Sequence, residues 1–286
     1  MLSIRRSAEK SASKDINSMA MVWLQQAVAI PLIIGSLFLA KFYWPGELSS
    51  TFWMLLALYV VTSVIDLYCY FKAISIADIS YVAPLLTLFV AGNMAGAFII
   101  LGQVPSMAGI AGAALIMAGA YLNNLAKRRQ KTNTKQNRLA LILVLVAILF
   151  RSFYANIEVI MLRETNPTSF NFYSSMATIP SVILVTWLIV RRNRSKYERY
   201  WSDVGAGAKR HFWPLVFVSV TYTVNMLATY QAKLLSPNAA YVAAIKSAAV
   251  VPLVLIGIFF FKEKVAGLQW AGIALIILGL VALATN

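Results

Sequence analysis

The sequence predicts an all-α, polytopic membrane protein with about nine transmembrane helices. Of its 286 residues, 60% are hydrophobic and only 12% are charged, which is more apolar than a soluble domain. Apolar runs of about 20 residues recur along the chain, and this is the length that crosses a bilayer. The expected transmembrane helices cover residues 19–41, 52–71, 80–101, 106–124, 139–161, 169–190, 212–231, 239–261 and 267–285.

The basic residues are distributed unevenly among the links between these helices. The N-terminal tail and the even-numbered links hold 20 of the 25 Lys and Arg residues, whereas the odd-numbered links hold Lys41, Arg163 and Lys233. Two basic residues are then left inside helices, Arg151 and Lys246. Because cytoplasmic loops carry the excess of Lys and Arg, we expect an inside N-terminus and an outside C-terminus. The net charge of +15 follows from this topology, so no nucleic-acid partner is expected.

Several classes of protein and site are excluded by the composition. The chain has one cysteine, Cys69, and one histidine, His211, so neither an intrachain disulfide nor a His or Cys metal site is expected. No nucleotide-binding loop occurs, and no polar segment is long enough for an ATPase domain. We expect no cofactor, no catalytic residue and no removable signal peptide. An integral-membrane enzyme is disfavoured because the carboxylates are scattered.

The sequence repeats itself when it is shifted by 160 residues. This shift aligns "FWML" at 52 with "FWPL" at 212, and "GAALIMAG" at 112 with "GIALIILG" at 272. Helices one to four therefore match helices six to nine. An odd number of crossings separates each matched pair, so the halves are inverted repeats, as is typical of secondary transporters. The predicted parts of this one membrane domain are an N-terminal repeat (1–125), a basic link (126–138) and a C-terminal half (139–286).

Glycines and prolines inside the expected helices predict packing and bending. Paired small residues let helices approach closely, and proline removes a backbone donor and can kink a helix. The glycine pairs are Gly92 with Gly96, Gly112 with Gly119, and Gly272 with Gly279. The prolines are Pro31, Pro84, Pro180 and Pro252.

The two copies resemble the EamA-like permeases of the drug/metabolite transporter superfamily. The similarity covers nearly all of the chain and is most specific in a tyrosine, an apolar helix, a polar link and then G-x-A-L-I-x-x-G. The family's glycine and glutamate stand as Gly102 and Gln103 in the first copy, and as Lys262 and Glu263 in the second. The resemblance implies ten helices with both ends in the cytoplasm. Here the opening helix has no counterpart, so the start is truncated or a nine-helix form is genuine.

Four ionisable residues fall at membrane depth: Asp66, Arg151, Glu158 and Lys246. A charge there costs roughly 2.5–3.5 kcal/mol on insertion scales, so each should face protein or water rather than lipid. Arg151 and Glu158 share one helical face but lie about 10 Å apart along the axis, too far to pair tightly. Two interpretations stay open: fixed interhelical pairs, or residues that line a central polar cavity.

Further candidates come from similarity to relatives. Lys246 is similar to a lysine that meets an anionic substrate in triose-phosphate translocators and nucleotide-sugar transporters, although the arginine that follows it there is Ser247 here. "NFYSSM" at 171–176 is similar to a base-reading motif of nucleotide-sugar transporters, which makes Tyr173 and Ser174 candidates. Asn225 is a further polar residue that needs a partner or the cavity.

These observations predict a secondary-active transporter of a small polar metabolite, with amino acids or other organic anions favoured. Lys246 and Arg151 are expected to attract the negative group of the substrate, and Asp66 or Glu158 to take up a coupling proton or a substrate amine. The expected partners are the small-molecule substrate, the lipid bilayer and coupling protons, with a homodimer left open. The expected location is a bacterial or archaeal cell membrane. The alternatives are a non-transporting binding or sensing protein and a flippase of a lipid-linked sugar.

Overall fold

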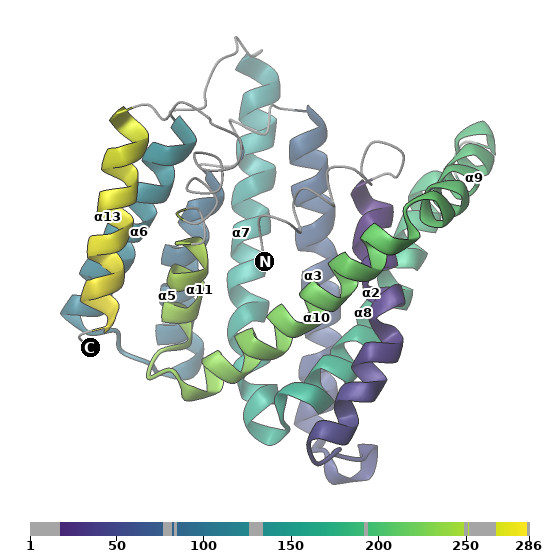
Figure 1. Ribbon diagram of the computed structural model, residues 1–286, viewed down its shortest axis with the longest axis horizontal. Coiled ribbons are helices and arrows are strands. Elements are labelled where there is room, and N and C mark those ends of the chain that lie inside the picture. Colours follow the sequence, from purple (N-terminus) through teal and green to yellow (C-terminus); the bar gives the residue numbers. More distant parts are fainter. Residues whose placement is uncertain are drawn as a thin grey trace. The chain divides into compact units, whose positions relative to one another are not determined.

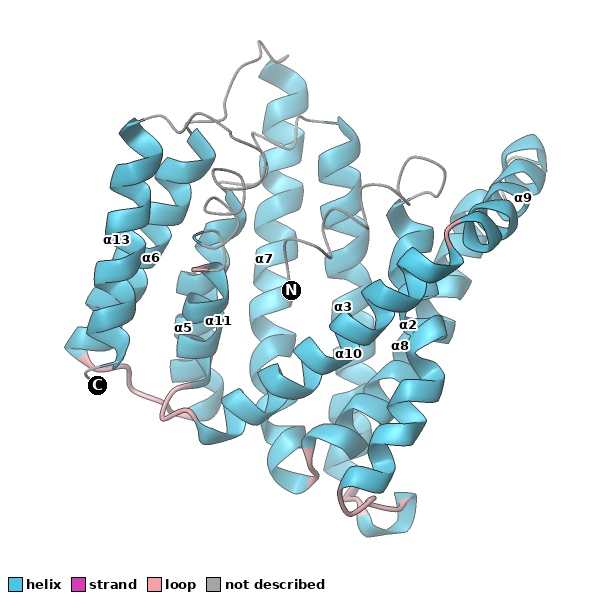
Figure 2. Ribbon diagram, viewed as in Figure 1, coloured by secondary structure: helices cyan, strands magenta, loops and turns pink. Residues whose placement is uncertain are grey.

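The structure, a computed structural model, describes residues 18–76, 82, 85–125, 134–191, 194–248, 251 and 267–284. Within these ranges the regular elements are helices joined by short links (Figures 1 and 2). The helices are α2 (Ser18–Ser36), η1 (Leu37–Leu39), η2 (Pro45–Glu47), α3 (Ser50–Ile76), η3 (Leu86–Leu88), α5 (Phe89–Leu101), α6 (Met107–Leu125), α7 (Thr134–Glu164), α8 (Pro167–Val190), α9 (Arg194–Arg210), α10 (Phe212–Leu235), α11 (Ala239–Ser247) and α13 (Gly267–Ala284).

The lengths and composition of these helices confirm a multi-pass membrane protein. Ser50–Ala73, Arg138–Glu164, Pro167–Val190 and Phe212–Leu235 are each long and apolar enough to cross a bilayer. Shorter apolar helices cover Trp23–Ser36, Leu86–Leu101, Met107–Leu122 and Gly267–Leu283. Together these match eight of the nine expected spans. Of the remaining span, 239–261, the structure describes α11, Ala248 and Val251. Pro252 and Pro84 lie outside the described residues.

Helix α9 lies in a segment that the sequence analysis treated as a link. Its apolar positions are four residues apart, which places them on one helical face. Val204, buried to 4% exposure, packs with Leu24 of α2 and Leu215 of α10, and the partly buried Tyr200 and Ala208 pack against this cluster. The many basic residues of this segment hid the apolar face.

The described residues form two compact units. One contains the described parts of Met1–Val64 and Met161–Gln231, and the other those of Ile65–Ile160 and Ala232–Asn286. Each unit therefore draws on both predicted sequence repeats, and α3, α7 and α10 contribute residues to both units. We call them unit 1 and unit 2. Within the described spans, the helical segments of unit 1 at 18–36, 50–64, 167–190 and 212–231 contain no Asp, Glu, Lys or Arg.

Glycine contacts hold α6 against α13 in unit 2, where the two helices lie side by side (Figure 1). A Cβ atom on Gly112 would come within 2.8 Å of the Gly279 carbonyl oxygen, and one on Gly279 within 2.6 Å of the Gly112 carbonyl. Such distances leave no room for a side chain. On α5, Gly92 and Gly96 likewise face Ser152 and Asn156 of α7. The glycine pairs are packing faces, as the sequence predicts.

Many hydroxyl groups of unit 1 are bonded within their own helix. On α10, for example, Ser219 Oγ donates to the Leu215 carbonyl at 2.8 Å, and Thr229 Oγ1 donates to the Asn225 carbonyl at 2.6 Å. The same pattern occurs at Ser36, Thr62, Ser63, Ser181, Thr221 and Thr223. Back-bonding of this kind satisfies a hydroxyl in hydrocarbon without a neighbouring helix.

Candidate functional site

A charged cluster in unit 2 is built by α3 and α7. Arg151 Nε donates to Asp66 Oδ2 and Arg151 Nη2 donates to Asp66 Oδ1, each at 3.0 Å. The hydroxyl of Tyr154, one turn further along α7, donates to Asp66 Oδ2 at 3.0 Å. The aspartate therefore accepts three hydrogen bonds, two of them from a planar guanidinium in the bidentate geometry that is strongest for a carboxylate.

The two charged partners of this cluster differ in exposure. The Asp66 side chain is 1% exposed, whereas that of Arg151 is 25% exposed. The Tyr70 ring, one turn beyond Asp66 on α3, lies 5.5 Å from the Arg151 guanidinium carbon, within cation–π range. The guanidinium is thus held between a buried carboxylate and an aromatic ring, and the Arg151 side chain as a whole is less buried than that of Asp66.

A second ion pair in unit 2 joins α7 to α10. Lys233 Nζ lies 2.7 Å from Glu158 Oε1 and donates to the Ala155 carbonyl oxygen at 2.9 Å, and both charged side chains are 7% exposed. Arg151 pairs with Asp66 of α3 and Glu158 with Lys233 of α10, so each of the two α7 residues has a partner on a different helix. The placement of Lys233 in a link was wrong, because α10 continues to Leu235. A buried carboxylate that compensates the ammonium allows this lysine to lie inside the helix.

Lys246 lies in the last turn of α11 and its side chain is exposed. Its helix starts at a fixed point: Asn238 caps it by accepting from the Ala240 N–H at 2.9 Å, and Gln103 Oε1 accepts from the Ala239 N–H at 3.0 Å. Gln103 follows Gly102, which ends α5 in the left-handed conformation at φ 65°. The residues of the family motif in the first copy therefore position the helix that carries Lys246. The substrate contact of Lys246 stays a prediction.

Tyr173, Ser174 and Asn225 belong to unit 1. The Tyr173 side chain is buried, and its hydroxyl donates to the Tyr43 carbonyl oxygen at 2.7 Å. Ser174 is buried with its hydroxyl 3.3 Å from the Asn171 carbonyl oxygen, and Asn225 is half-buried on α10. These contacts are made within the protein, and a role in substrate binding remains a prediction for all three residues.

The ring of Tyr173 stands among other aromatic rings at the link between α2 and α3. Its centroid lies 5.7 Å from that of Phe42, in a stacked arrangement, and 5.7 Å from that of Phe52. In the same link, a hydrogen bond from the backbone N–H of Trp44 holds the pKa of Glu47 below its usual value, and the Lys41 ammonium, 3.4 Å away, acts in the same direction. This link is therefore ordered by its own contacts.

Sequence reasoning missed Tyr154, Tyr70 and Lys233 as members of the charged clusters. The spacing carried part of the signal, since Tyr154 lies three residues after Arg151 and Tyr70 four after Asp66, and such residues are neighbours on a helix. No group of three or more His, Cys, Asp or Glu that could hold a metal ion occurs among the described residues.

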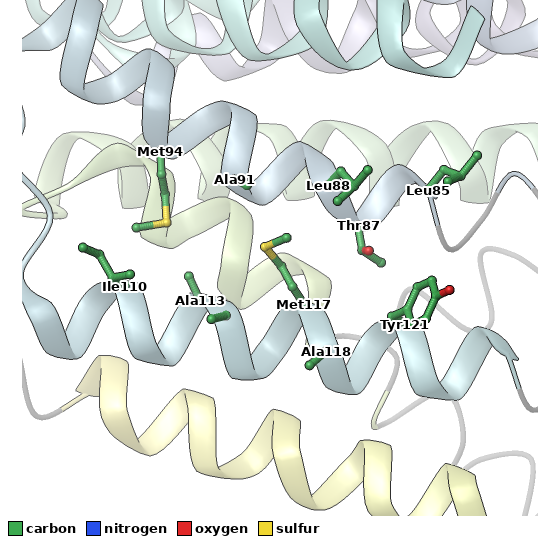
Figure 3. Close-up of a pocket in the computed structure, with 11 residues that line it drawn as sticks. Leu85, Thr87, Leu88, Ala91, Met94, Ile110, Ala113, Met117, Ala118 and Tyr121 are labelled. Carbon is green, nitrogen blue, oxygen red and sulfur yellow. The ribbon is translucent and has the colours of Figure 1, made fainter. Parts of the chain in front are cut away.

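An apolar cavity of about 460 Å³ lies elsewhere in unit 2, between η3, α5 and α6 (Figure 3). Hydrophobic side chains dominate its wall, and the hydroxyl-bearing residues Thr87 and Tyr121 lie towards one end (Figure 3). None of the predicted site residues lines it. The lining residues are Leu85, Thr87, Leu88, Ala91, Met94, Ile110, Ala113, Ala114, Met117, Ala118 and Tyr121.

Comparison with known proteins identifies the family. The sequence model of the EamA-like transporter family matches residues 8–125 and 138–285, one match for each repeat. A solved structure, described only as a crystal structure of a protein, shares the fold with a TM-score of 0.68 at 15% identity; the alignment covers 98% of this chain and 92% of that one. No curated protein sequence matches the chain. The chain is an integral, multi-pass membrane protein with two repeats, and it belongs to the EamA-like transporter family of the drug/metabolite transporter superfamily.

Proposed function

We propose that this protein is a secondary-active transporter that moves a small polar metabolite across the membrane by alternating access, with amino acids and other organic anions as its favoured substrates. Membership of a transporter family supports transport, and the chemistry of the charged cluster supports the substrate class. No chemical step in a substrate is needed for this function, so the protein is not proposed as an enzyme.

The paired arginine inside a membrane-spanning helix, Arg151, is the observation that carries the proposal. An arginine inside a membrane-spanning helix is costly unless it is paired, and it marks substrate pathways when part of it remains accessible. A planar guanidinium matches a carboxylate in two parallel hydrogen bonds. Arg151 keeps a quarter of its side-chain surface accessible although its partner Asp66 is buried. An organic anion is therefore the ligand that this side chain fits best.

Lys246 supplies a second positive charge in this proposal. The ammonium of Lys246 is a compact point charge that attracts carboxylate or phosphate without the directional preference of a guanidinium. The Glu158–Lys233 pair is too buried to exchange partners with a substrate, so we assign to it the role of joining α7 and α10. For Tyr173, Ser174 and Asn225, which belong to unit 1, a contact with substrate stays a prediction from the sequence alone.

Uptake and counterflow in reconstituted proteoliposomes test the proposal. The panel contains radiolabelled amino acids, monocarboxylates and dicarboxylates, and we expect saturable counterflow for at least one of them. Lys246→Ala should lower the uptake of that substrate at least tenfold, whereas Lys209→Ala, an exposed lysine on α9, should leave it unchanged. Uptake that Lys246→Ala does not alter would remove Lys246 from the site. Binding without counterflow would support the sensing alternative instead.

The apolar cavity favours a second candidate function, the flipping of a lipid-linked sugar. A hydrophobic wall with hydroxyl-bearing residues at one end suits a lipid chain whose polar group lies at that end. Ala118→Trp would fill this cavity, and Ala111→Trp places the same ring on an exposed position of α6 outside the lining. If lipid-linked sugar translocation in proteoliposomes falls only in Ala118→Trp, the second function is supported. If neither variant translocates less than the parent, it is refuted.

A further inference from the structure

We infer that Asp66 is the coupling-proton site of this transporter and that a proton on Asp66 accompanies each substrate carboxylate bound to Arg151. The inference rests on the proposed function and narrows it, since sequence reasoning left Asp66 and Glu158 as equal candidates. It also assigns the substrate class to carboxylates, because the same guanidinium serves both the aspartate and the anion.

The charges around Arg151 already balance in the structure. The guanidinium is already neutralised by Asp66 through two hydrogen bonds of 3.0 Å. If an anionic substrate joined this pair, two carboxylates would share one positive charge in a site where Asp66 is 1% exposed. An uncompensated buried charge is strongly unfavourable. Protonation of Asp66 removes the excess negative charge, so the anion and the proton bind together.

Exposure separates Asp66 from Glu158 as the proton site. The side chain of Arg151, the partner of Asp66, is 25% exposed, so we place the substrate at Arg151, next to the positive charge that a protonated Asp66 would release. Glu158 and its partner Lys233 are each only 7% exposed, and Lys233 is also bonded to the Ala155 carbonyl. Protonation of Glu158 would therefore leave a buried ammonium that no substrate can reach.

Of the ionisable groups around Arg151, we assign the change of protonation to Asp66. Among the described residues, the titratable and charged groups that face it are Arg151 and Tyr154 on α7 and Cys69 on its own helix, while the Tyr70 ring faces Arg151. Thiols and phenols ordinarily ionise well above neutral pH, and arginine stays charged. The Tyr154 hydroxyl donates to Asp66 Oδ2 and so stabilises the ionised carboxylate.

The exchange has a simple balance. A proton from the aqueous phase joins an oxygen of Asp66, Arg151 keeps its charge, and the substrate carboxylate accepts hydrogen bonds from the guanidinium. No covalent bond other than the O–H bond of Asp66 forms or breaks. A monocarboxylate then crosses with one proton and no net charge, whereas a zwitterionic amino acid crosses with one positive charge.

The test uses the full-length protein in proteoliposomes and the monocarboxylate of the panel that is carried fastest. We expect uptake to depend on the pH gradient and not on an imposed potassium diffusion potential. At external pH above the titration midpoint of Asp66, the rate should fall about tenfold per pH unit, because the protonated fraction falls by that factor. Asp66→Asn imitates the protonated residue, so counterflow should persist and become independent of pH while accumulation against a gradient is lost.

Tyr154→Phe gives a second readout that does not require Asp66 to be replaced. Loss of the phenol donor favours the protonated carboxylate, so the pH at which uptake is half-maximal should move upward on the order of one unit. Glu164→Gln, a carboxylate at the end of the same helix, should keep the parent profile. Uptake driven by the potential alone, or proton coupling that survives in Asp66→Asn, would overturn the inference. If no panel member is carried at all, the proposed function itself fails.

Discussion

Replacing Lys233 by methionine measures what the buried ion pair with Glu158 contributes. Methionine keeps an unbranched side chain but removes the ammonium, leaving the Glu158 carboxylate at 7% exposure without the partner that lies 2.7 Å from it. Removing one member of a buried pair typically costs about 3–5 kcal/mol, because an uncompensated charge remains. The free energy of unfolding should therefore fall by about that amount.

Thermal unfolding in detergent, followed by size-exclusion chromatography, is the assay. Taking roughly 2–4 °C per kcal/mol for a chain of this size, the unfolding temperature of Lys233→Met should drop on the order of 10 °C. Lys209→Met, which alters an exposed lysine on α9, should change it by about 1 °C at most.

The double variant Glu158→Leu with Lys233→Met decides the interpretation. Both charges are then gone, and replacing a buried pair by apolar residues is often neutral. The double variant should recover most of the stability lost in Lys233→Met. If it is as unstable as the sum of the two single variants, the residues do not act as a pair and the reasoning is refuted.

Three further predictions concern packing, the α2–α3 link and orientation. Gly279→Val should separate α6 from α13 and lower the unfolding temperature, at a cost of about 1–3 kcal/mol in the free energy of unfolding. Gly46→Ala, where an added Cβ has nothing within 4 Å, should leave the unfolding temperature unchanged. Equal effects of the two substitutions would disprove the close contact. Tyr173→Phe removes the hydrogen bond to the Tyr43 carbonyl and should lower the free energy of unfolding by about 1 kcal/mol. Tyr173→Ala should lower it further because the aromatic ring is lost as well. Equal losses would show that the ring contributes nothing to stability. In a Cys69→Ala background, a membrane-impermeant maleimide should label Asn286→Cys from outside in intact cells but not Lys131→Cys, and labelling at 131 would overturn the inside N-terminus.

The sequence singled out charged residues that need compensation at membrane depth, but it did not predict their partners. Asp66, Arg151 and Glu158 stood out because a charge at membrane depth needs compensation. Which helix supplies that compensation depends on how α3, α7 and α10 are aligned in space, and local spacing does not encode this alignment. Lys233 was placed in a link for the same reason. A charged lysine inside a membrane helix is unfavourable, and only its pairing with Glu158 in the folded structure offsets that free-energy cost.

The fold was more predictable than the site, because every segment that crosses the hydrocarbon core must be an apolar helix of about the same length. Apolar runs of bilayer length located the spans that the structure describes. Helix α9 escaped because its basic composition resembles a loop, and its apolar positions, such as Val204, become visible only when they are read at helical spacing. The glycines of α6 and α13 were recognised because their spacing repeats in both copies.

The hydroxyl groups that bond within their own helices differ from the ion pairs in what they require of a neighbouring helix. The serines and threonines of α10 within unit 1 are satisfied internally, so they need no polar partner from a neighbour. The ion pairs that join α3 to α7, and α7 to the end of α10, are different, because separating either pair of helices would leave unpaired charges in the hydrocarbon region. Serines and threonines that bond within their own helix therefore leave the choice of neighbour open, whereas each ion pair fixes which two helices must lie together.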